Sequence, residues 1–184
     1  MRTVEVRRHA ERDGNEDLTA KGLEQCAIAK RTFEFPYDAY ATSPAKRARL
    51  TMEALGGGPA TEEPRLAPRP RPPFEPFERR HAELMAAGAD AVTAWFAIPE
   101  ANPALLALGR DALAAALDIA AKLPDAGRAL AVTHGGTIEP LAVAALGRSY
   151  PSIFGNRELA YCEGVRVYML EGRVARLDVV RLPI

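Results

Sequence analysis

Three short segments of the sequence combine residue types that could bind and transfer a phosphoryl group. Arg8 and His9 are neighbours near the N-terminus, Arg47 follows a Ser-Pro pair, and His134 precedes two glycines. A neutral imidazole can act as a nucleophile, and the planar guanidinium group matches the oxygens of a phosphate. If the fold brings these side chains together, they form a phosphate pocket.

Each of these segments follows a predicted β-strand. Residues 3–8 alternate apolar and charged side chains, residues 38–42 form a short apolar segment, and residues 129–133 are a continuous apolar run typical of a central parallel strand. In open α/β sheets, ligands bind beyond the carboxyl ends of the parallel strands. The pattern therefore predicts that both histidines and Arg47 meet at one edge of the sheet, beside helix N-termini that favour anions.

Helices are predicted between and after these strands, and a hairpin closes the chain. Ser43 is expected to cap the helix that begins at Pro44. Glycine in the pair Glu171-Gly172 favours a tight turn between two final strands. This order predicts an α/β fold, a three-layer α/β/α sandwich with a mixed, mostly parallel sheet. The predicted helices cover residues 19–33, 44–55, 79–96, 103–122 and 137–146, and the final strands cover 164–170 and 173–180.

Residues 59–80 differ from the rest of the chain because they hold seven of its 15 prolines. Proline at this density excludes a long helix or a central strand, so the segment is expected to run over the surface as an extended excursion. Its arginines either attract an acidic substrate or keep the loop soluble; they are Arg65, Arg69, Arg71, Arg79 and Arg80. With this excursion included, residues 1–184 are expected to form one domain.

Composition narrows the classes of function. The chain of 184 residues is 48% hydrophobic and 26% charged, an ordinary globular balance. Its 24 basic residues cancel its 24 acidic ones, which argues against a nucleic-acid or membrane-surface partner. No apolar run reaches the roughly 18 residues of a membrane span, and the two cysteines form no CxxC motif. We expect a cytoplasmic protein.

Taken together, the motifs resemble those of the histidine phosphatase superfamily, the phosphoglycerate mutase-like proteins. Residues 8–11 resemble its RHG motif, with Ala10 in place of the usual glycine. The resemblance covers residues 1 to about 55 and 128 to 147, and it implies a phosphoglycerate mutase-like fold. The other matching segments are 18–25 (LT-x-x-G-x-x-Q), 42–51 (SSP-x-x-RA-x-x-T) and 132–136 (V-x-HGG).

The resemblance also implies roles for single residues. His9 would be the catalytic nucleophile that becomes phosphohistidine, and His134 a second catalytic residue that helps to hold the phosphoryl oxygens. The remaining phosphate-binding residues would be Arg8, Asn15, Arg47 and the backbone near Gly135.

The general acid is less clearly marked. The family usually places a glutamate two residues after a leucine in this region, but here Leu66 is followed at that spacing by Pro68. Glu75 is our candidate, with Glu78 and Glu63 as alternatives. A weakly basic leaving group, as in a phosphoramidate, would make this acid less important.

The sequence therefore favours a metal-independent phosphatase without a cofactor, which hydrolyses phosphomonoesters or phosphohistidine. Its substrate would be a phosphorylated small molecule or a phosphoprotein. Two alternatives remain open: phosphoryl transfer of the phosphoglycerate mutase type, and a non-catalytic phosphate-binding module. The short chain offers residues 59–80 as the lid, which favours hydrolysis because a mutase must exclude water.

Overall fold

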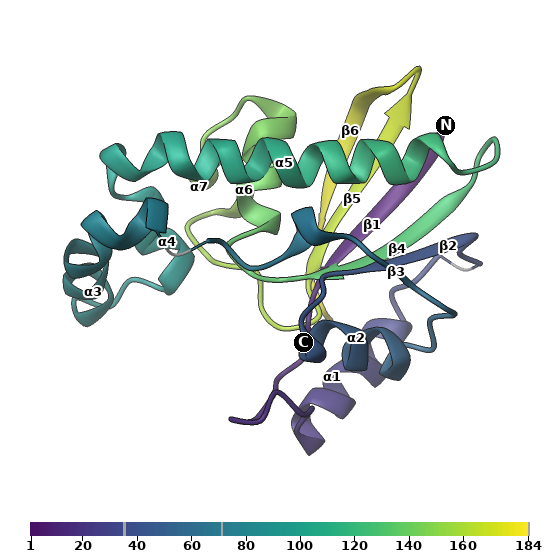
Figure 1. The fold of residues 1–184 in the computed structure, drawn as a ribbon, viewed down its shortest axis with the longest axis horizontal. Coiled ribbons are helices and arrows are strands. Elements are labelled where there is room, and N and C mark those ends of the chain that lie inside the picture. Colours follow the sequence, from purple (N-terminus) through teal and green to yellow (C-terminus); the bar gives the residue numbers. More distant parts are fainter. Residues whose placement is uncertain (35, 71, 184) are drawn as a thin grey trace.

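The computed structural model describes residues 1–34, 36–70 and 72–183, and within them six strands form a single sheet (Figure 1). The expectation for Arg71 lies outside the described residues. The strand order across the sheet is β3-β2-β4-β1-β5-β6. The strands are β1 (Arg2–Arg8), β2 (Ala39–Thr42), β3 (Thr61–Glu62), β4 (Arg128–Thr133), β5 (Gly164–Leu170) and β6 (Arg173–Val180).

The sheet is mixed and mostly parallel, as predicted. β4 pairs in parallel with β1 and β2, and β2 pairs in parallel with β3. β5 runs antiparallel to both β1 and β6. The predicted final hairpin is present, with positive φ angles at Glu171 and Gly172 in its turn.

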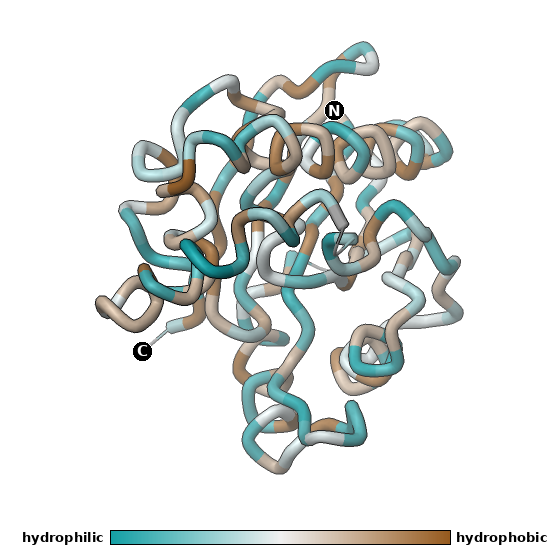
Figure 2. Tube along the Cα trace, turned by 60° about the vertical axis from the view of Figure 1, so that its left-hand side comes forward, coloured by the Kyte–Doolittle hydropathy of each residue, from teal (hydrophilic) through white to brown (hydrophobic). Residues whose placement is uncertain are grey.

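Helices cover both faces of the sheet, which makes the three-layer sandwich. Ala129 and Ala131 of β4 pack into the apolar cluster on one face, while Leu130 and Val132 pack into the cluster on the other. The apolar run of β4 thus serves both layers, as its sequence predicted. One layer contains α5 (Asn102–Ala121), α6 (Ile138–Leu146) and α7 (Tyr150–Phe154); the other contains α1 (Ala20–Lys30) and α2 (Lys46–Ala54). α5 is mostly apolar, and the residues that it buries include Leu105, Ala112 and Ala116; Figure 2 colours the whole trace by hydropathy.

Residues 72–101 form a small lobe beyond one end of α5 (Figure 1). Its own apolar cluster contains Phe74, Trp95 and Leu105, the last of these from α5. The segment 59–80, which was expected to be an extended excursion, is only partly extended, because 3₁₀ helices form over residues 64–66 and 72–77 and an α-helix begins at Glu78. The elements after β3 are η1 (Pro64–Leu66), η2 (Pro72–Phe77), α3 (Glu78–Ala86), α4 (Ala91–Phe96) and η3 (Pro99–Ala101).

The structure corrects three predicted elements. The helix expected over 79–96 is two helices, because Gly88 adopts a φ of +99° and Asp90 then caps α4 through the backbone N–H of Thr93. The first helix ends at Lys30 rather than near residue 33. Ser43 does not cap α2, which begins at Lys46, and α7 was not predicted.

Candidate active site

The predicted histidines and Arg47 meet at the carboxyl edge of the sheet. His9 follows β1, His134 follows β4, Ser43 follows β2, and Arg47 lies in the first turn of α2. Because β1, β4 and β2 are parallel neighbours, their ends lie side by side. The imidazole centroids of the two histidines are 5.2 Å apart.

The hydrogen bonds of His9 fix its tautomer. Its Nδ1 lies 2.8 Å from the carbonyl oxygen of Ala10, and Arg47 Nε donates to its Nε2 at 3.2 Å. Since Nε2 accepts a hydrogen bond, the ring proton is on Nδ1 and points to the Ala10 carbonyl. His9 is therefore a neutral imidazole whose Nε2 lone pair is directed toward Arg47.

His134 is held as the opposite tautomer. Arg47 Nη2 donates to its Nδ1 at 3.1 Å, so its Nε2 carries the proton and donates to Ser43 Oγ at 2.7 Å. One guanidinium group thus contacts both histidines. The role of Ser43 was missed at the sequence level, where its position suggested only a helix cap; its place directly after a predicted strand was the available signal.

Burial and positive charge keep both imidazoles neutral. Burial lowers the pKa of His9 to about 4, with the charges of Arg47 and Arg8 adding to the effect. Burial also lowers the pKa of His134 to about 2, again with help from Arg47. A neutral imidazole is the form that can attack phosphorus, so the surroundings favour the reactive form of His9.

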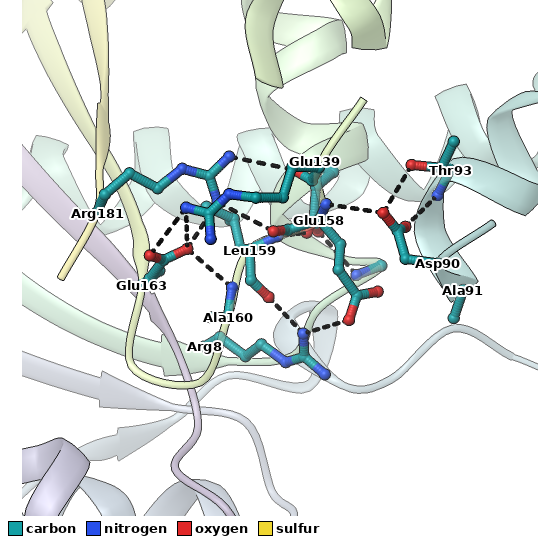
Figure 3. A network of polar contacts seen from close by, with 12 residues as sticks. Arg8, Asp90, Ala91, Thr93, Glu139, Glu158, Leu159, Ala160, Glu163 and Arg181 are labelled. Carbon is teal, nitrogen blue, oxygen red and sulfur yellow. Dashed lines mark hydrogen bonds and ion pairs between the residues drawn. The ribbon is translucent and has the colours of Figure 1, made fainter. Parts of the chain in front are cut away.

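Residues of the segment that precedes β5 contact the Arg8 side chain and hold it in position (Figure 3). Its Nη1 donates to the Glu158 carboxylate at 3.2 Å and to the Leu159 carbonyl, and its guanidinium lies 4.6 Å from the ring centroid of Tyr161. Its Nε is buried and has no hydrogen-bond partner within the described part of the chain. An unpaired N–H donor beside two histidines could bind a ligand oxygen.

The loop after His134 is tied to the same segment. The buried carboxylate of Glu139 accepts hydrogen bonds from the backbone N–H of Gly136 at 2.8 Å and of Leu159 at 3.1 Å (Figure 3). A Cβ on Gly135 would lie 3.0 Å from the Arg8 guanidinium carbon. Glycine is therefore what lets this loop approach Arg8 closely.

These groups line a cavity of about 310 Å³, near the small end of the range for small-molecule sites. Its charged part is lined by Arg8, His9, Arg47 and His134, with Glu158 beside Arg8. Its other part is apolar and is formed mainly by the lobe and α5. The residues of this apolar part are Pro68, Val92, Trp95, Phe96, Leu105 and Pro140, and Arg12 and Arg69 also contribute to the lining.

Two predicted site residues lie away from this cavity. Asn15 is exposed and is not part of its lining; its backbone carbonyl accepts a hydrogen bond from Lys46. Glu75 is exposed on η2 and does not line the cavity either, whereas Pro68 does. The expectation that Glu75 supplies the proton has no support from its position, because a general acid must reach the leaving group.

The alternative acids are no closer. Glu63 is outside the lining and its carboxylate is paired with Arg65 at 2.7 Å, while Glu78 begins α3. The cavity holds a different carboxylate, Glu158. A further acid that sequence reasoning missed is Glu16, which forms an ion pair with Arg47 Nη1.

The arrangement can bind a tetrahedral oxyanion and attack it. Guanidinium N–H groups of Arg8 and Arg47 provide positive charge, and His9 Nε2 provides a nucleophilic lone pair once Arg47 Nε releases it. Glu16 now occupies one donor of Arg47, so an anion that binds there must compete with its carboxylate.

The described residues contain neither a metal-binding cluster nor a membrane-spanning helix. Across 1–34, 36–70 and 72–183, no group of three or more His, Cys, Asp or Glu side chains is arranged to hold a metal ion. In the same ranges, no helix combines the length and the apolar character needed to cross a membrane.

Comparisons with known proteins identify the family. The family model of the histidine phosphatase superfamily (branch 1) matches residues 3–179. No curated protein matches the sequence. Many solved structures are similar, all of those compared below at low sequence identity.

Three solved structures illustrate the shared fold. A mycobacterial glucosyl-3-phosphoglycerate phosphatase in complex with VO3 has a TM-score of 0.69 at 19% identity, with 100% of both chains covered. A phosphoserine phosphatase from Entamoeba histolytica has a TM-score of 0.67 at 14% identity, covering 98% of this chain and 97% of that one. A phosphoglycerate mutase from Bacillus anthracis has a TM-score of 0.67 at 13% identity, covering 98% and 92%.

Proposed function

Because the chain belongs to the histidine phosphatase superfamily, we propose that it is a metal-independent phosphatase that works through a phosphohistidine at His9. The observation that carries the proposal is the pair of hydrogen bonds from Arg47 to both histidines, which hold a neutral His9 with its Nε2 in the charged part of the cavity; Arg47 Nε releases the Nε2 lone pair when it turns to a phosphoryl oxygen. Its substrate is a phosphomonoester or a phosphohistidine. The solved relatives include phosphatases named for phosphoserine and for glucosyl-3-phosphoglycerate, which supports a small phosphorylated substrate.

The reaction proceeds in two displacements. In the first, His9 Nε2 forms a bond to phosphorus while the bond to the leaving group breaks, and the leaving group departs with the electron pair. In the second, water attacks phosphorus, the P–N bond breaks and inorganic phosphate is released. Arg8 and Arg47 stabilise the negative charge on the phosphoryl oxygens in both steps, and His134 adds an N–H donor when its Nε2–H turns from Ser43 to one of these oxygens.

The carboxylates near the cavity favour weakly basic leaving groups. Glu75 lies outside the cavity, Pro68 lines it at the spacing where the acid was expected, and Glu158, which also lines it, is paired with Arg8. A leaving group that needs no proton, such as an aryl oxide or the imidazole of a phosphoramidate, is then cleaved faster than an alkoxide. Glu75→Gln is accordingly expected to leave the rate on alkyl phosphates unchanged, whereas a drop of about 10²-fold would restore Glu75 as the acid.

Hydrolysis of 4-nitrophenyl phosphate by the wild type and by His9→Ala tests the function. The wild type is expected to release phosphate continuously, with or without chelator, and His9→Ala to release none above the uncatalysed rate. Turnover that persists in His9→Ala would overturn the nucleophile. If the wild type binds inorganic phosphate but hydrolyses no phosphoester or phosphoramidate, the protein is the non-catalytic module. If it transfers the phosphoryl group to a second phosphorylated acceptor rather than to water, it is a mutase.

A further inference from the structure

Two buried thiols lie beside each other, outside the set of residues that line the cavity. Cys26 is on α1 and Cys162 is in the segment that precedes β5; both are free, and neither is more than 1% exposed. Their Sγ atoms are 3.9 Å apart, although 136 positions separate the two residues in the sequence. They are the two cysteines of the whole chain, and the proposed reaction uses neither.

The backbone of Cys162 holds its thiol against α1. Its φ of +62° lies in the left-handed region, which is uncommon for residues other than glycine. Its N–H donates to the Arg8 carbonyl at 3.1 Å, and its own carbonyl accepts from Arg7 Nη1 at 3.0 Å. These bonds to β1 keep the residue in this conformation, with its sulfur beside that of Cys26. A disulfide requires only about 2 Å between the sulfurs, so forming one draws the two residues together.

The contact makes the two thiols chemically different. With Cys162 as the donor of the S–H···S hydrogen bond, the pKa of Cys26 falls below its usual value. The same hydrogen bond, together with burial, raises the pKa of Cys162. Because the thiolate is the nucleophilic form of cysteine, Cys26 is the sulfur that reacts first, and Cys162 is placed to react with its product.

Cys26 follows a residue that holds the loop after His9. Gln25 Oε1 accepts a hydrogen bond from the Glu11 backbone N–H at 2.9 Å. Cys26 also packs in the apolar cluster that contains Ala10, whose carbonyl fixes the tautomer of His9. A movement of α1 at Cys26 is therefore passed to the loop that carries the nucleophile.

Cys162 follows a residue that lines the cavity. The Tyr161 ring centroid lies 4.6 Å from the central carbon of the Arg8 guanidinium and 5.6 Å from the ring centroid of His9. A movement at Cys162 therefore reaches both the guanidinium and the imidazole of the site.

We propose that Cys26 and Cys162 are a site of reversible oxidation, where hydrogen peroxide joins them in a disulfide. The new bond draws α1 toward the segment before β5, which displaces the supports of His9 and Arg8 and weakens phosphate binding. Of the proposed function, this inference needs only that the cavity binds phosphate.

The oxidation proceeds in two balanced steps. In the first, Cys26 Sγ attacks a peroxide oxygen, the O–O bond breaks, and a sulfenic acid and water form. In the second, Cys162 Sγ attacks the Cys26 sulfur, the S–O bond breaks, and the hydroxide that leaves takes up the thiol proton to become water. The two thiols lose two electrons and two protons, and the peroxide takes up both. Since both thiols are buried, the peroxide reaches them through local opening of the structure, and we expect a slow reaction.

Peptide mapping tests the modification without turnover. We would incubate the whole protein with hydrogen peroxide, remove the peroxide, alkylate the remaining thiols in denaturant and digest with trypsin without reductant. Peptides 22–30 and 158–166 should then appear joined, lighter than their sum by the mass of two hydrogens, and should separate after treatment with dithiothreitol.

Calorimetry with inorganic phosphate tests the effect on the cavity. The oxidised wild type should bind phosphate about threefold or more weakly than the reduced protein, because small displacements of positioning groups are costly at such a site. Dithiothreitol should restore the original affinity.

Two variants that cannot form the disulfide are the controls. Cys162→Ser and Cys26→Ala should bind phosphate like the reduced wild type, before and after peroxide. Cys26→Ala leaves the left-handed residue in place, so it covers the case in which Cys162→Ser does not fold.

Three results would overturn the proposal. If peroxide oxidises the exposed Met85 while both thiols are still alkylated separately, the pair is not a site of oxidation. A disulfide that leaves the phosphate affinity unchanged would refute the coupling to the cavity, and so would an equal loss of affinity in Cys26→Ala. If the reduced wild type binds no phosphate, the proposed function fails, whereas the peptide map still decides the modification.

Discussion

Arg47 is the residue on which the geometry of the site depends most. It donates one hydrogen bond to each histidine and pairs with Glu16 through a third nitrogen. The sequence predicted that Arg47 meets both histidines at one edge of the sheet, near a helix N-terminus whose dipole disfavours a cation, but it did not show which groups offset that cost. The structure shows what holds it there: two neutral imidazole acceptors and a carboxylate.

His9 is expected to stay neutral far below the ordinary histidine pKa. Burial, with the charges of Arg47 and Arg8, lowers its pKa from 6.5 to about 4, so the imidazole is unprotonated at every pH well above 4. We expect its ring resonances in NMR, assigned by comparison with His9→Gln, to show no titration between pH 8 and 5. A midpoint near 6.5 would contradict the described surroundings.

Glu16 competes with anions for Arg47. Its carboxylate is about a third exposed, so the ion pair is worth less than about 1 kcal/mol. Glu16→Gln should therefore bind inorganic phosphate about two- to fivefold more tightly in calorimetry. Asp17→Asn, in the same loop but paired with Lys46, is the matched control and should bind phosphate like the wild type. Unchanged affinity in Glu16→Gln would show that the pair does not limit access to Arg47.

At the level of elements, residues 18–25, which lead into the first turns of α1, hold the loop that follows His9. Gln25 Oε1 accepts a hydrogen bond from the Glu11 backbone at 2.9 Å, and the Thr19 hydroxyl donates to the Glu11 carboxylate at 3.0 Å. Thr19 also caps α1, because its hydroxyl oxygen accepts a hydrogen bond from the Gly22 backbone N–H. These residues of the LT-x-x-G-x-x-Q stretch thus position the nucleophile loop rather than contact a ligand.

The loop between β4 and α6 must come close to Arg8. A Cβ at position 135 would meet the Arg8 guanidinium at 3.0 Å, so Gly135→Ala should shift the Arg8 side chain by a few tenths of an ångström and lower kcat, by less than the roughly 10²-fold that complete loss of a charge-stabilising donor costs. Gly14→Ala, in a loop where a Cβ meets nothing within 4 Å, is the control and should keep the wild-type rate. A wild-type kcat in Gly135→Ala would mean that the contact with Gly135 does not fix the position of Arg8.

The sequence predicted the elements with strong periodicity and missed those decided by tertiary contacts. The strands before His9 and His134 were predicted because apolar patterns and strand ends are local features. The break at Gly88 and the short helix α7 were not, since a single glycine inside a helical pattern is compatible with either outcome. Glu75 was chosen by spacing alone, and spacing along a Pro-rich segment does not fix which side chains reach a cavity.

The first strand shows a second limit. Its alternation places Val4 and Val6 on one face, yet Glu5 and Arg7 on the other face are buried as well. β1 lies in the middle of the sheet with helices on both sides, and Glu5 pairs with both Arg7 and Arg166 there. Nothing in one strand's sequence shows that its polar face will contact Thr32 and Phe33, which follow α1, and pair with a residue of β5.

At the scale of the whole molecule, we propose that the lobe and the sheet form one domain. Trp95, the sole tryptophan of the chain, lies in the lobe, whereas most helix and strand signal in circular dichroism comes from the sandwich. Asp90 of the lobe accepts a hydrogen bond from the Glu158 backbone, which links it to the segment that holds Arg8 (Figure 3). Tryptophan fluorescence and far-ultraviolet circular dichroism should therefore show coincident urea transitions. Earlier loss of the fluorescence signal would make the lobe a separate unit.

The most direct test of the central claim is to trap the covalent intermediate. We would mix the wild type with an excess of an aryl phosphate, quench within one turnover in alkali, which preserves phosphohistidine, and locate the added phosphoryl group by peptide mass spectrometry. The account predicts one phosphoryl group on His9, absent from His9→Ala and from protein mixed with inorganic sulfate. Continued turnover with no adduct, or an adduct on a residue other than His9, would contradict it.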